Sequence, residues 1–274
     1  MKRIDVSLIL ACYNEAGLFA ESVRRIKDVL DFSRFTYEII FVDDHSRDGT
    51  KELIRDVIRG FASNGAEVGA PWFSHRQGPD RNIIHQVNDA KAMTVLRNGA
   101  PPRAIFHRVN QGRGGSVVDG IKAAKGSVVG YIDIDCEVSP VYIPHMVSLI
   151  LQKKADVVIG RRFYRTSPSS LIREVLSRGY QWLSDRMIGT GGLDTETGYK
   201  FFARKKIVPI LSKTKHPGWF WDTEIMVYAR RAGLKITEVP VLFLRRFDKH
   251  SSVNIFRDTI DYLVQLIRFR RSLR

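Results

Sequence analysis

The sequence predicts an α/β fold in which helices cover both faces of a mostly parallel central sheet. Over the first half of the 274-residue chain, short β-rich runs alternate with stretches of helical periodicity, which is the pattern of a parallel α/β sheet. The β-rich runs are continuously apolar, as expected for strands that are buried on both faces. A chain of this length that is 44% hydrophobic can bury one large core or two modest ones.

The first two strand–helix units lie before the middle of the chain. The run DVSLILA, residues 5–11, predicts the first strand, and a helix over 17–31 follows the polar segment CYNEAG. The run YEIIFV, residues 37–42, predicts the second strand. The turn VDDHSRDGT after it contains Asp and Ser, which favour helix N-caps, so we expect a helix over 48–61.

A long insertion separates these units from three further strands. Residues 63–102 are rich in Gly, Pro and Asn, and a structureless loop of that length is unusual in a compact domain. We therefore expect a helix over 81–97 and assign the insertion no function. The remaining predicted elements are strands 103–108, 127–133 and 155–160 and helices 115–125 and 140–152.

Charge, cysteine content and hydropathy limit the class of protein. Lys and Arg number 44 against 29 Asp and Glu, and the resulting net charge of +15 favours nucleic acid, an anionic membrane surface or phosphate-rich small molecules. The sequence has no recognition helix, zinc-ligand spacing or RNP-like aromatic motif, so we expect no nucleic-acid partner. The two cysteines make no disulfide framework and fit a reducing compartment. We expect no signal peptide, and no run reaches the roughly 18–20 apolar residues that span a bilayer.

Polar clusters follow three of the predicted strands, at the edge where an α/β sheet binds its ligands. In the cluster YIDIDCE, Asp133 and Asp135 share one face of an extended segment, and Glu137 joins them if the extension continues. Three adjacent carboxylates repel one another unless a cation lies among them, and Mg²⁺ or Mn²⁺ bridging a diphosphate is the usual occupant of such sparse sites. The alternative is an ion pair between one acid and an arginine: Arg113, Arg161 or Arg162.

Two turns that open helices add candidate ligand contacts. In VDDHSRDGT, Asp44 accepts a hydrogen bond from a nucleobase N–H, or the turn serves only as a helix cap. In NQGRGGSVVDG, glycines let the backbone approach a ligand closely, and the helix N-terminus favours an anion. Arg113 adds a positive charge to this second turn.

Together these motifs resemble family 2 glycosyltransferases. Seven segments occur in the order seen in that family: LILACYNE, EIIFVDDHSRDGT, NQGRGGSVVDGIKAAKGSVVGYIDID, IGRRF, LDTETGYKFFARKKI, GWFWDTEIMVYARRAGLKITEVPV and RRFDKHSSV. They cover about residues 5–255 apart from the insertion, and they are most similar to dolichyl-phosphate (polyprenyl-phosphate) mannose and glucose synthases. The resemblance implies a GT-A fold with a Rossmann-like sheet, a UDP- or GDP-hexose donor, Mg²⁺ or Mn²⁺, and inverting transfer of glucose or mannose to a lipid phosphate.

The resemblance also implies residues of the donor site. Asp44 falls on the residue that reads the base, and Ala11 stands where the family usually has proline. Asp133 and Asp135 are the DxD pair, and Glu137 stands where the family often has glutamine. The implied donor-binding residues are Ala11, Tyr13, Glu15, Asp44, Arg113 and Asp133, and the implied metal ligands are Asp133, Asp135 and Glu137.

The later motifs imply residues for catalysis. Arg161 or Arg162 lies where an arginine of the family contacts phosphate, and the segment WDTE turns towards the acceptor. In TETGYK, Thr197 and Tyr199 replace the Cys and Phe of the glucosyl branch. A closing loop contributes Arg245, Arg246 and Ser251. The implied catalytic set is Asp133, Asp135, Asp222, Glu224, Arg162 and Arg246.

Two kinds of acceptor remain open. A phosphate monoester has a second pKa of about 6 and is already a nucleophile at neutral pH, whereas an alcohol needs a general base, for which Asp222 is the candidate. Asp222 also has a structural interpretation as the cap of a helix over 223–232. Trp219 and Trp221 likewise have an interpretation as plain core residues.

The last twenty residues predict a separate element. Residues 1–254 form the GT-A domain with its insertion, and residues 255–274 form a basic amphipathic helix. The apolar stripe of this helix is Phe256, Ile260, Leu263, Val264 and Ile267, and the arginines near its end are Arg268, Arg270, Arg271 and Arg274. We expect the protein to lie peripherally at the cytoplasmic face of a membrane, on the membrane surface or on a membrane-anchored partner. The alternative is that the stripe packs on the catalytic domain.

Overall fold

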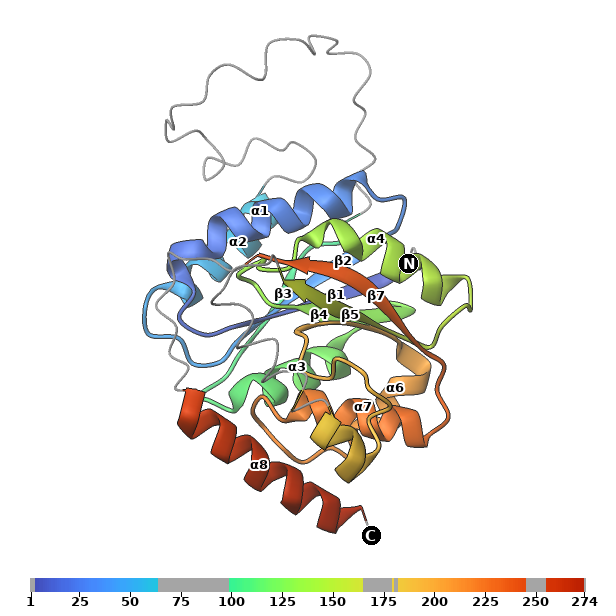
Figure 1. Ribbon diagram of the computed structural model, residues 1–274. Helices are drawn as coiled ribbons and strands as arrows, with labels where there is room; N and C mark the ends of the chain where they lie inside the picture. Colours follow the sequence, from blue (N-terminus) through green and yellow to red (C-terminus); the bar gives the residue numbers. More distant parts are fainter. Residues whose placement is uncertain (1–2, 64–98, 165–178, 180–181, 245–254, 274) are drawn as a thin grey trace.

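The computed structural model describes residues 3–63, 99–164, 179, 182–244 and 255–273. Within these ranges the strands form one seven-stranded sheet in the order β3-β2-β1-β4-β6-β5-β7, with helices on both faces (Figure 1). The strands are β1 (Val6–Cys12), β2 (Tyr37–Asp43), β3 (Arg103–Phe106), β4 (Val128–Ile132), β5 (Val157–Tyr164), β6 (Tyr199–Ala203) and β7 (Ile236–Phe243). The helices are α1 (Ala16–Phe32), α2 (Thr50–Ser63), α3 (Gly112–Ala123), α4 (Ile143–Leu151, after a short 3₁₀ turn), α6 (Arg204–Leu211), α7 (Trp221–Arg231) and α8 (Ile255–Ser272).

The predicted strands and helices of the first half are confirmed, although several of their ends differ by a few residues. The helix expected over 81–97 lies outside the described residues, as does most of the insertion. The prediction omitted β6 and β7. Both follow the central helices, where the alternation of strand and helix on which the prediction rested is less regular.

The sheet is parallel on one side and mixed on the other. Strands β3, β2, β1 and β4 are parallel to their neighbours. Strand β6 runs antiparallel between β4 and β5, and β7 is parallel to β5. Because β6 is antiparallel, its first residues lie at the edge where β4 and β5 end. The segment that precedes β6 therefore meets the polar strand ends.

Two apolar cores lie on opposite faces of the sheet. Strand side chains alternate between them, so that Leu8 and Leu10 belong to one core and Ile9 to the other. Helices α1, α2 and α4 cover the first core, and α3, α6 and α7 cover the second (Figure 1). This three-layer arrangement leaves the strand-end loops as the place where polar side chains can gather.

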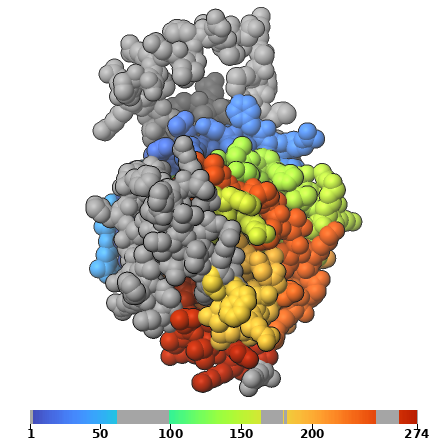
Figure 2. All heavy atoms as spheres, viewed as in Figure 1, coloured from blue at the N-terminus to red at the C-terminus, as the bar shows by residue number. Residues whose placement is uncertain are grey.

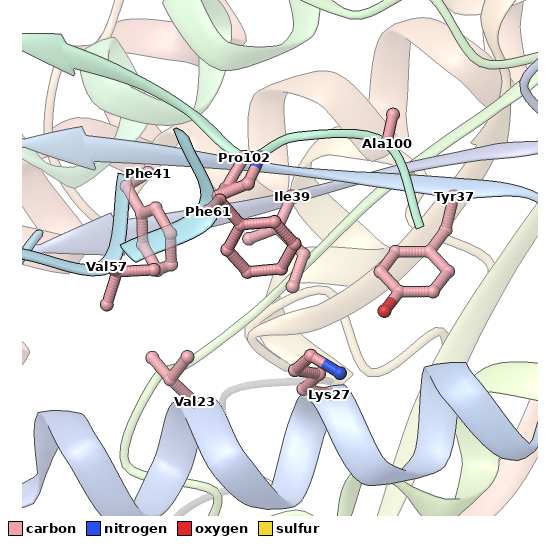
Figure 3. Close-up of a pocket in the computed structure, with 9 residues that line it drawn as sticks. All are labelled: Val23, Lys27, Tyr37, Ile39, Phe41, Val57, Phe61, Ala100 and Pro102. Carbon is pink, nitrogen blue, oxygen red and sulfur yellow. The ribbon is translucent and has the colours of Figure 1, made fainter. Parts of the chain in front are cut away.

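The cavity drawn in Figure 3 belongs to the first core. It lies between α1, β2, α2 and the segment before β3, and apolar side chains such as Val23, Phe41 and Phe61 line it. Its volume of about 10 Å³ is room for one water molecule at most. It is therefore a packing gap, separate from the strand ends.

Helix α8 packs beyond α7, at the foot of the molecule in Figure 1. Tyr262 and Phe269 meet Phe220, and Phe269 also meets Tyr228, with ring centroids 5.5–5.7 Å apart. Leu266 is completely buried in the same cluster. Within the described residues, no helix combines the length and the apolar character needed to cross a membrane.

Candidate active site

The loops after β1 and β2 are tied together by hydrogen bonds. The Asn14 N–H donates to Ser46 Oγ at 3.0 Å, and the Arg47 N–H donates to Asn14 Oδ1 at 2.8 Å. The predicted donor-binding residues Ala11, Tyr13 and Glu15 lie at the end of β1 and in the loop after it, and the Tyr13 ring is 49% exposed. These two loops thus form one rim of the strand-end edge.

Asp44 directly follows β2 in the chain, and its buried side chain lies against the start of α3. Its carboxylate accepts the N–H of Gln111 at 2.7 Å and of Gly112 at 2.8 Å, and its Oδ1 lies 2.8 Å from His107 Nδ1. The helix α2 has a different cap, Asp48, which accepts the Thr50 N–H at 3.1 Å. The carboxylate assigned to the base is therefore buried and already accepts from protein donors, so part of its role is to hold the start of α3.

The segment after β4 is a turn, and the prediction of an extended segment there is wrong. Strand β4 ends at Ile132, the Cys136 N–H donates to the Asp133 carbonyl at 3.2 Å, and Cys136 has a φ of 53°. The Glu137 N–H donates to Asp135 Oδ1 at 3.2 Å. In the described part of the chain, no three His, Cys, Asp or Glu side chains gather closely enough to hold a metal ion. The predicted triad of Asp133, Asp135 and Glu137 is therefore not preformed, because the turn removes the shared face.

Asp133 and Asp135 still suit a sparse Mg²⁺ or Mn²⁺ site. The Asp133 side chain is 40% exposed at the sheet edge, so its carboxylate is accessible to a ligand. Magnesium typically takes only one or two protein carboxylates and completes its shell with water and substrate phosphate oxygens. Two carboxylates one residue apart at an open edge fit that pattern.

Arg113 is the centre of a buried ion-pair network. Its Nε and Nη2 donate to Asp133 Oδ1 at 3.0 and 2.6 Å, and its Nη1 donates to Asp222 Oδ2. The guanidinium lies between the rings of Tyr131 and Trp219, 5.3 and 4.7 Å from their centroids. Burial lowers the pKa of Arg113, but the attraction of the two carboxylates outweighs burial and raises it overall. The ion pair between one of the acids and Arg113 is thus present, and Asp133 remains 40% exposed beside it.

Asp222 lies inside the first turn of α7, and its predicted role as a helix cap is wrong. The helix begins at Trp221 and has no side-chain cap. The Asp222 carboxylate accepts from Arg113, from the Tyr131 hydroxyl and from Lys200 Nζ at 2.6 Å. Lys200 is fully buried, and burial lowers its pKa while Asp222 opposes that shift. Two cations and a hydroxyl therefore surround a carboxylate that is itself 2% exposed.

The two tryptophans of this segment differ. Trp221 is buried against Tyr131, which confirms the core interpretation for that residue, whereas Trp219 is 58% exposed. Because Trp219 stacks on the buried Arg113 with one face, its ring covers the guanidinium at the surface. It is a candidate wall of the ligand site.

The predicted phosphate arginines are paired with acids. Arg162 Nε and Nη2 donate to the Asp194 carboxylate at 2.9 and 2.8 Å, and Nη2 lies 3.5 Å from Glu196 Oε2. The exposed Arg161 lies 3.5 Å from Glu238. Burial raises the pKa of Glu196, and Arg162 partly opposes this while Asp194 adds to it.

Of the two remaining catalytic candidates, Glu224 has partners outside this network, and Arg246 lies outside the described residues. Glu224 Oε2 accepts the backbone N–H groups of Lys215 and His216 at 2.8 and 2.9 Å. It therefore shapes the loop before α7. The rest of the closing loop lies outside the described residues as well.

Strand β6 and the residue before it place two further residues in this network, for which no role had been predicted. Gly198 is essential to the geometry, because a Cβ there would overlap the Asp133 carboxylate. Lys200 had a signal in the sequence: a lone lysine in the apolar run YKFFA needs an acidic partner if it is buried. Nothing in the sequence around Tyr131 indicated that its hydroxyl would contact Asp222.

Comparisons with known proteins identify the family. The model described as glycosyl transferase family 2 matches residues 7–68 and 86–209, which is more than half of the chain. The chain is 24% identical over 269 residues to the glycosyltransferase AglD of Haloferax volcanii, covering 97% of this chain and 37% of the relative. It is 26% identical to the dolichyl-phosphate beta-glucosyltransferase ALG5A of Trichomonas vaginalis, covering 87% of this chain and 65% of the relative. A dolichyl-phosphate beta-glucosyltransferase of Dictyostelium discoideum is 23% identical, with 97% and 74% covered.

Solved structures show the same fold. Glucosyl-3-phosphoglycerate synthase of Mycobacterium tuberculosis, in complex with UDP, has a TM-score of 0.60 at 18% identity, covering 97% of this chain and 80% of that one. Staphylococcus aureus TarS 1–349, in complex with UDP-GlcNAc, has a TM-score of 0.55 at 14% identity, covering 96% and 65%. The fold is thus the expected GT-A-like fold with a mostly parallel sheet, and the chain spans only part of the length of several of these proteins. On the family match, the chain belongs to glycosyl transferase family 2.

Proposed function

We propose that the protein transfers a hexose, with inversion, from a nucleotide-sugar to a polyprenyl phosphate. The names of two relatives, both dolichyl-phosphate beta-glucosyltransferases, favour glucose and a lipid phosphate. The fold neighbours bound to UDP or UDP-GlcNAc favour a uridine donor over a guanosine one. A lipid acceptor stays in the bilayer, so we place the protein peripherally at the cytoplasmic face of a membrane, on the lipid surface or on a membrane-anchored partner.

The state of Asp222 is the observation that carries the choice of acceptor. An alcohol acceptor requires a general base within hydrogen-bond reach, but the Asp222 carboxylate is 2% exposed and already accepts from Arg113, Lys200 and the Tyr131 hydroxyl. A phosphate monoester requires no base, because it is already ionised near neutral pH. The network therefore supports a phosphate acceptor, which needs only to be oriented.

In this proposal the described residues bind and orient both substrates. Asp133 and Asp135 hold a divalent ion, which when bound neutralises charge on the leaving diphosphate. Arg113, fixed between Asp133 and Asp222, presents a preorganised cation at the same edge, as electrostatic stabilisation requires. The Trp219 ring bounds this edge next to the guanidinium.

An acceptor panel tests the function. Purified protein is incubated with Mn²⁺ and radiolabelled UDP-glucose, UDP-galactose, GDP-glucose or GDP-mannose, together with polyprenyl phosphate or the matching polyprenol. We expect label in an acid-labile lipid only with polyprenyl phosphate, and most with UDP-glucose. The polyprenol is the control, because it has the same chain and lacks only the phosphate.

Two results would contradict the proposal. Transfer to polyprenol or to a free sugar, with none to polyprenyl phosphate, would favour the alcohol acceptor. Undiminished transfer in excess EDTA would show that the donor site works without a divalent ion.

A further inference from the structure

Helix α8 has two apolar faces, and only one of them is packed on the protein. The packed face consists of Tyr262, Leu266 and Phe269, which join the cluster around Phe220. The stripe predicted from the sequence is a different set. Of its members with described side chains, Leu263 is half-buried, whereas Val264 is 37% exposed and Ile267 is 45% exposed.

The geometry of the helix separates the two faces. Each residue turns an α-helix by about 100°, so Val264 and Ile267 point about 160° away from Leu266 and Phe269. The packing of α8 therefore does not use Val264 and Ile267 of the predicted stripe. It leaves two aliphatic side chains at the surface, where α8 forms the lower edge of the molecule (Figures 1 and 2).

Arginines extend the outward face. Arg271 follows Ile267 by four residues, which is the spacing of neighbours on one side of a helix. Arg270 follows Ile267 by three residues and lies at the border with the packed face, four residues after Leu266, and both arginines are exposed. Arg268 is exposed beside them, and Asp261, two turns before Arg268, is an exposed acid. Aliphatic side chains next to a cluster of cations are the pattern of helices that lie in the headgroup region of a bilayer.

We propose that this outward face, made of Val264, Ile267, Arg270 and Arg271, binds the surface of an anionic lipid bilayer. The argument is charge complementarity: the chain carries a net charge of +15, and the exposed cations gather beside the exposed aliphatic residues. The alternative partner is a membrane-anchored protein that presents an apolar patch. Such a patch would match the aliphatic side chains but would leave the neighbouring cations without opposite charges. The proposal deepens the proposed function, which needs access to a lipid acceptor, and its test requires no catalysis.

Vesicle flotation of the full chain tests the proposal. The vesicles are phosphatidylcholine alone or phosphatidylcholine with phosphatidylserine, at low and at high salt. We expect flotation only with the acidic vesicles, reduced by salt. Replacing two arginines, Arg270→Gln with Arg271→Gln, should lower the bound-to-free ratio roughly 10- to 30-fold, since each cation near an anionic surface contributes about 1 kcal/mol. The pair Val264→Gln and Ile267→Gln should lower it as well.

The matched controls carry the same changes elsewhere. Val208 in α6 is 37% exposed, as Val264 is, so Val208→Gln should leave flotation unchanged. Arg24→Gln with Arg59→Gln removes the same charge from the exposed surfaces of α1 and α2, and it should have a much smaller effect. Circular dichroism confirms that each variant is folded.

Three outcomes would overturn the proposal. The first is that the folded wild type does not float with acidic vesicles at low salt. The second is that the control variants lose flotation as much as the α8 variants do. The third is that the protein binds only native membranes and that protease treatment of those membranes abolishes this binding. The last result would assign the face to a membrane protein. Transfer to detergent-dispersed polyprenyl phosphate is assayed in parallel, so failure of membrane binding and failure of the proposed function are distinguished.

Discussion

Arg113 and Lys200 are buried cations that converge on one carboxylate, Asp222. Taking charges out of water is costly, and such a group persists only where its partners compensate it. Here the compensation is complete on the Asp222 side, whereas Asp133 keeps an exposed edge. At the residue scale, the network thus divides two acids of similar chemistry into an internal anchor, Asp222, and an acid that stays accessible at the surface, Asp133.

Replacing Asp222 distinguishes its two possible roles, a structural anchor for buried cations and a general base in catalysis. We expect Asp222→Asn to lower kcat by about tenfold or less with polyprenyl phosphate, because the acceptor needs no base, whereas loss of general-base catalysis typically costs about 10²–10⁴. The variant should also unfold more easily, by about 3–5 kcal/mol, because Arg113 and Lys200 lose a buried partner. Steady-state kinetics and urea unfolding measure the two effects. A fall of more than about a thousandfold in a folded variant would support the alcohol acceptor.

The raised pKa of Glu196 predicts a pH dependence of stability. Since its folded pKa lies above the ordinary value of 4.5, the folded state holds the proton more tightly than the unfolded state. This contribution to stability is present below pH 4.5 and is lost as pH rises through the folded pKa. Between pH 4.5 and neutrality the free energy of unfolding of the wild type should therefore fall by this contribution, whereas that of Glu196→Gln should not. Urea unfolding at a series of pH values measures the difference. Parallel curves for wild type and variant across that range would contradict the assignment.

At the scale of elements, strand ends and helix starts hold each other in place. Asp44 at the end of β2 accepts two N–H groups at the start of α3, which lie among the four donors that a helix leaves unpaired at its N-terminus. Strand β6 acts at the other side of the site, where its antiparallel direction brings Gly198 against Asp133 and Lys200 against Asp222. These pairings fix the loops before any substrate is bound.

The contacts of Asp44 predict a structural cost on its removal. We expect Asp44→Ala to lower the free energy of unfolding by about 1–3 kcal/mol, because buried donors lose their acceptor. If Asp44 also reads the base, Asp44→Ala should raise the donor KM more than Asp44→Asn does, because asparagine keeps one acceptor oxygen. Urea unfolding and donor kinetics are measured on both variants. Unchanged stability with a raised KM would favour base recognition alone.

At the scale of the molecule, one edge of the sheet collects the polar loops, and α8 lies beyond α7, outside the helix layer that covers the second core (Figure 1). The parallel half supplies the loops after β1, β2 and β4, and the mixed half supplies Asp194, Glu196 and Arg162. In the proposed function this edge would bind a nucleotide and a divalent ion, and ligands that bind only the folded chain stabilise the whole fold.

Thermal unfolding measures this stabilisation. With Mn²⁺ and UDP at about 100 times its dissociation constant, the stabilisation is about 2.7 kcal/mol, which corresponds to a rise in Tm of roughly 5–10 °C for a domain of this size. We expect UDP without Mn²⁺ to give little shift and Asp135→Asn to lose the Mn²⁺-dependent part. Asp28→Asn, at an exposed position of α1, is the matched control. An equal shift with EDTA would show that the nucleotide binds without the ion.

The sequence alone determined the parallel half of the fold and the family, because both depend on local patterns. Continuous apolar runs define β1, β2 and β4, and motifs such as VDDHSRDGT keep their order whatever the tertiary contacts are. The sequence also placed Asp133, Asp135 and Arg113 at strand ends and helix starts, and the structure has them there.

Only the tertiary structure decided which of these groups meet. The turn after β4 ended the extended segment on which a three-carboxylate metal site depended, and Arg113 took Asp133 as its partner. The insertion of β6 between β4 and β5 brought Lys200 to Asp222 from 22 residues away in the chain. The packed face of α8 was likewise decided by the rings that α7 and its preceding loop present, and it leaves Val264 and Ile267 of the predicted stripe exposed. Periodicity specifies that a residue lies on a face, whereas partners distant in sequence determine what that face contacts.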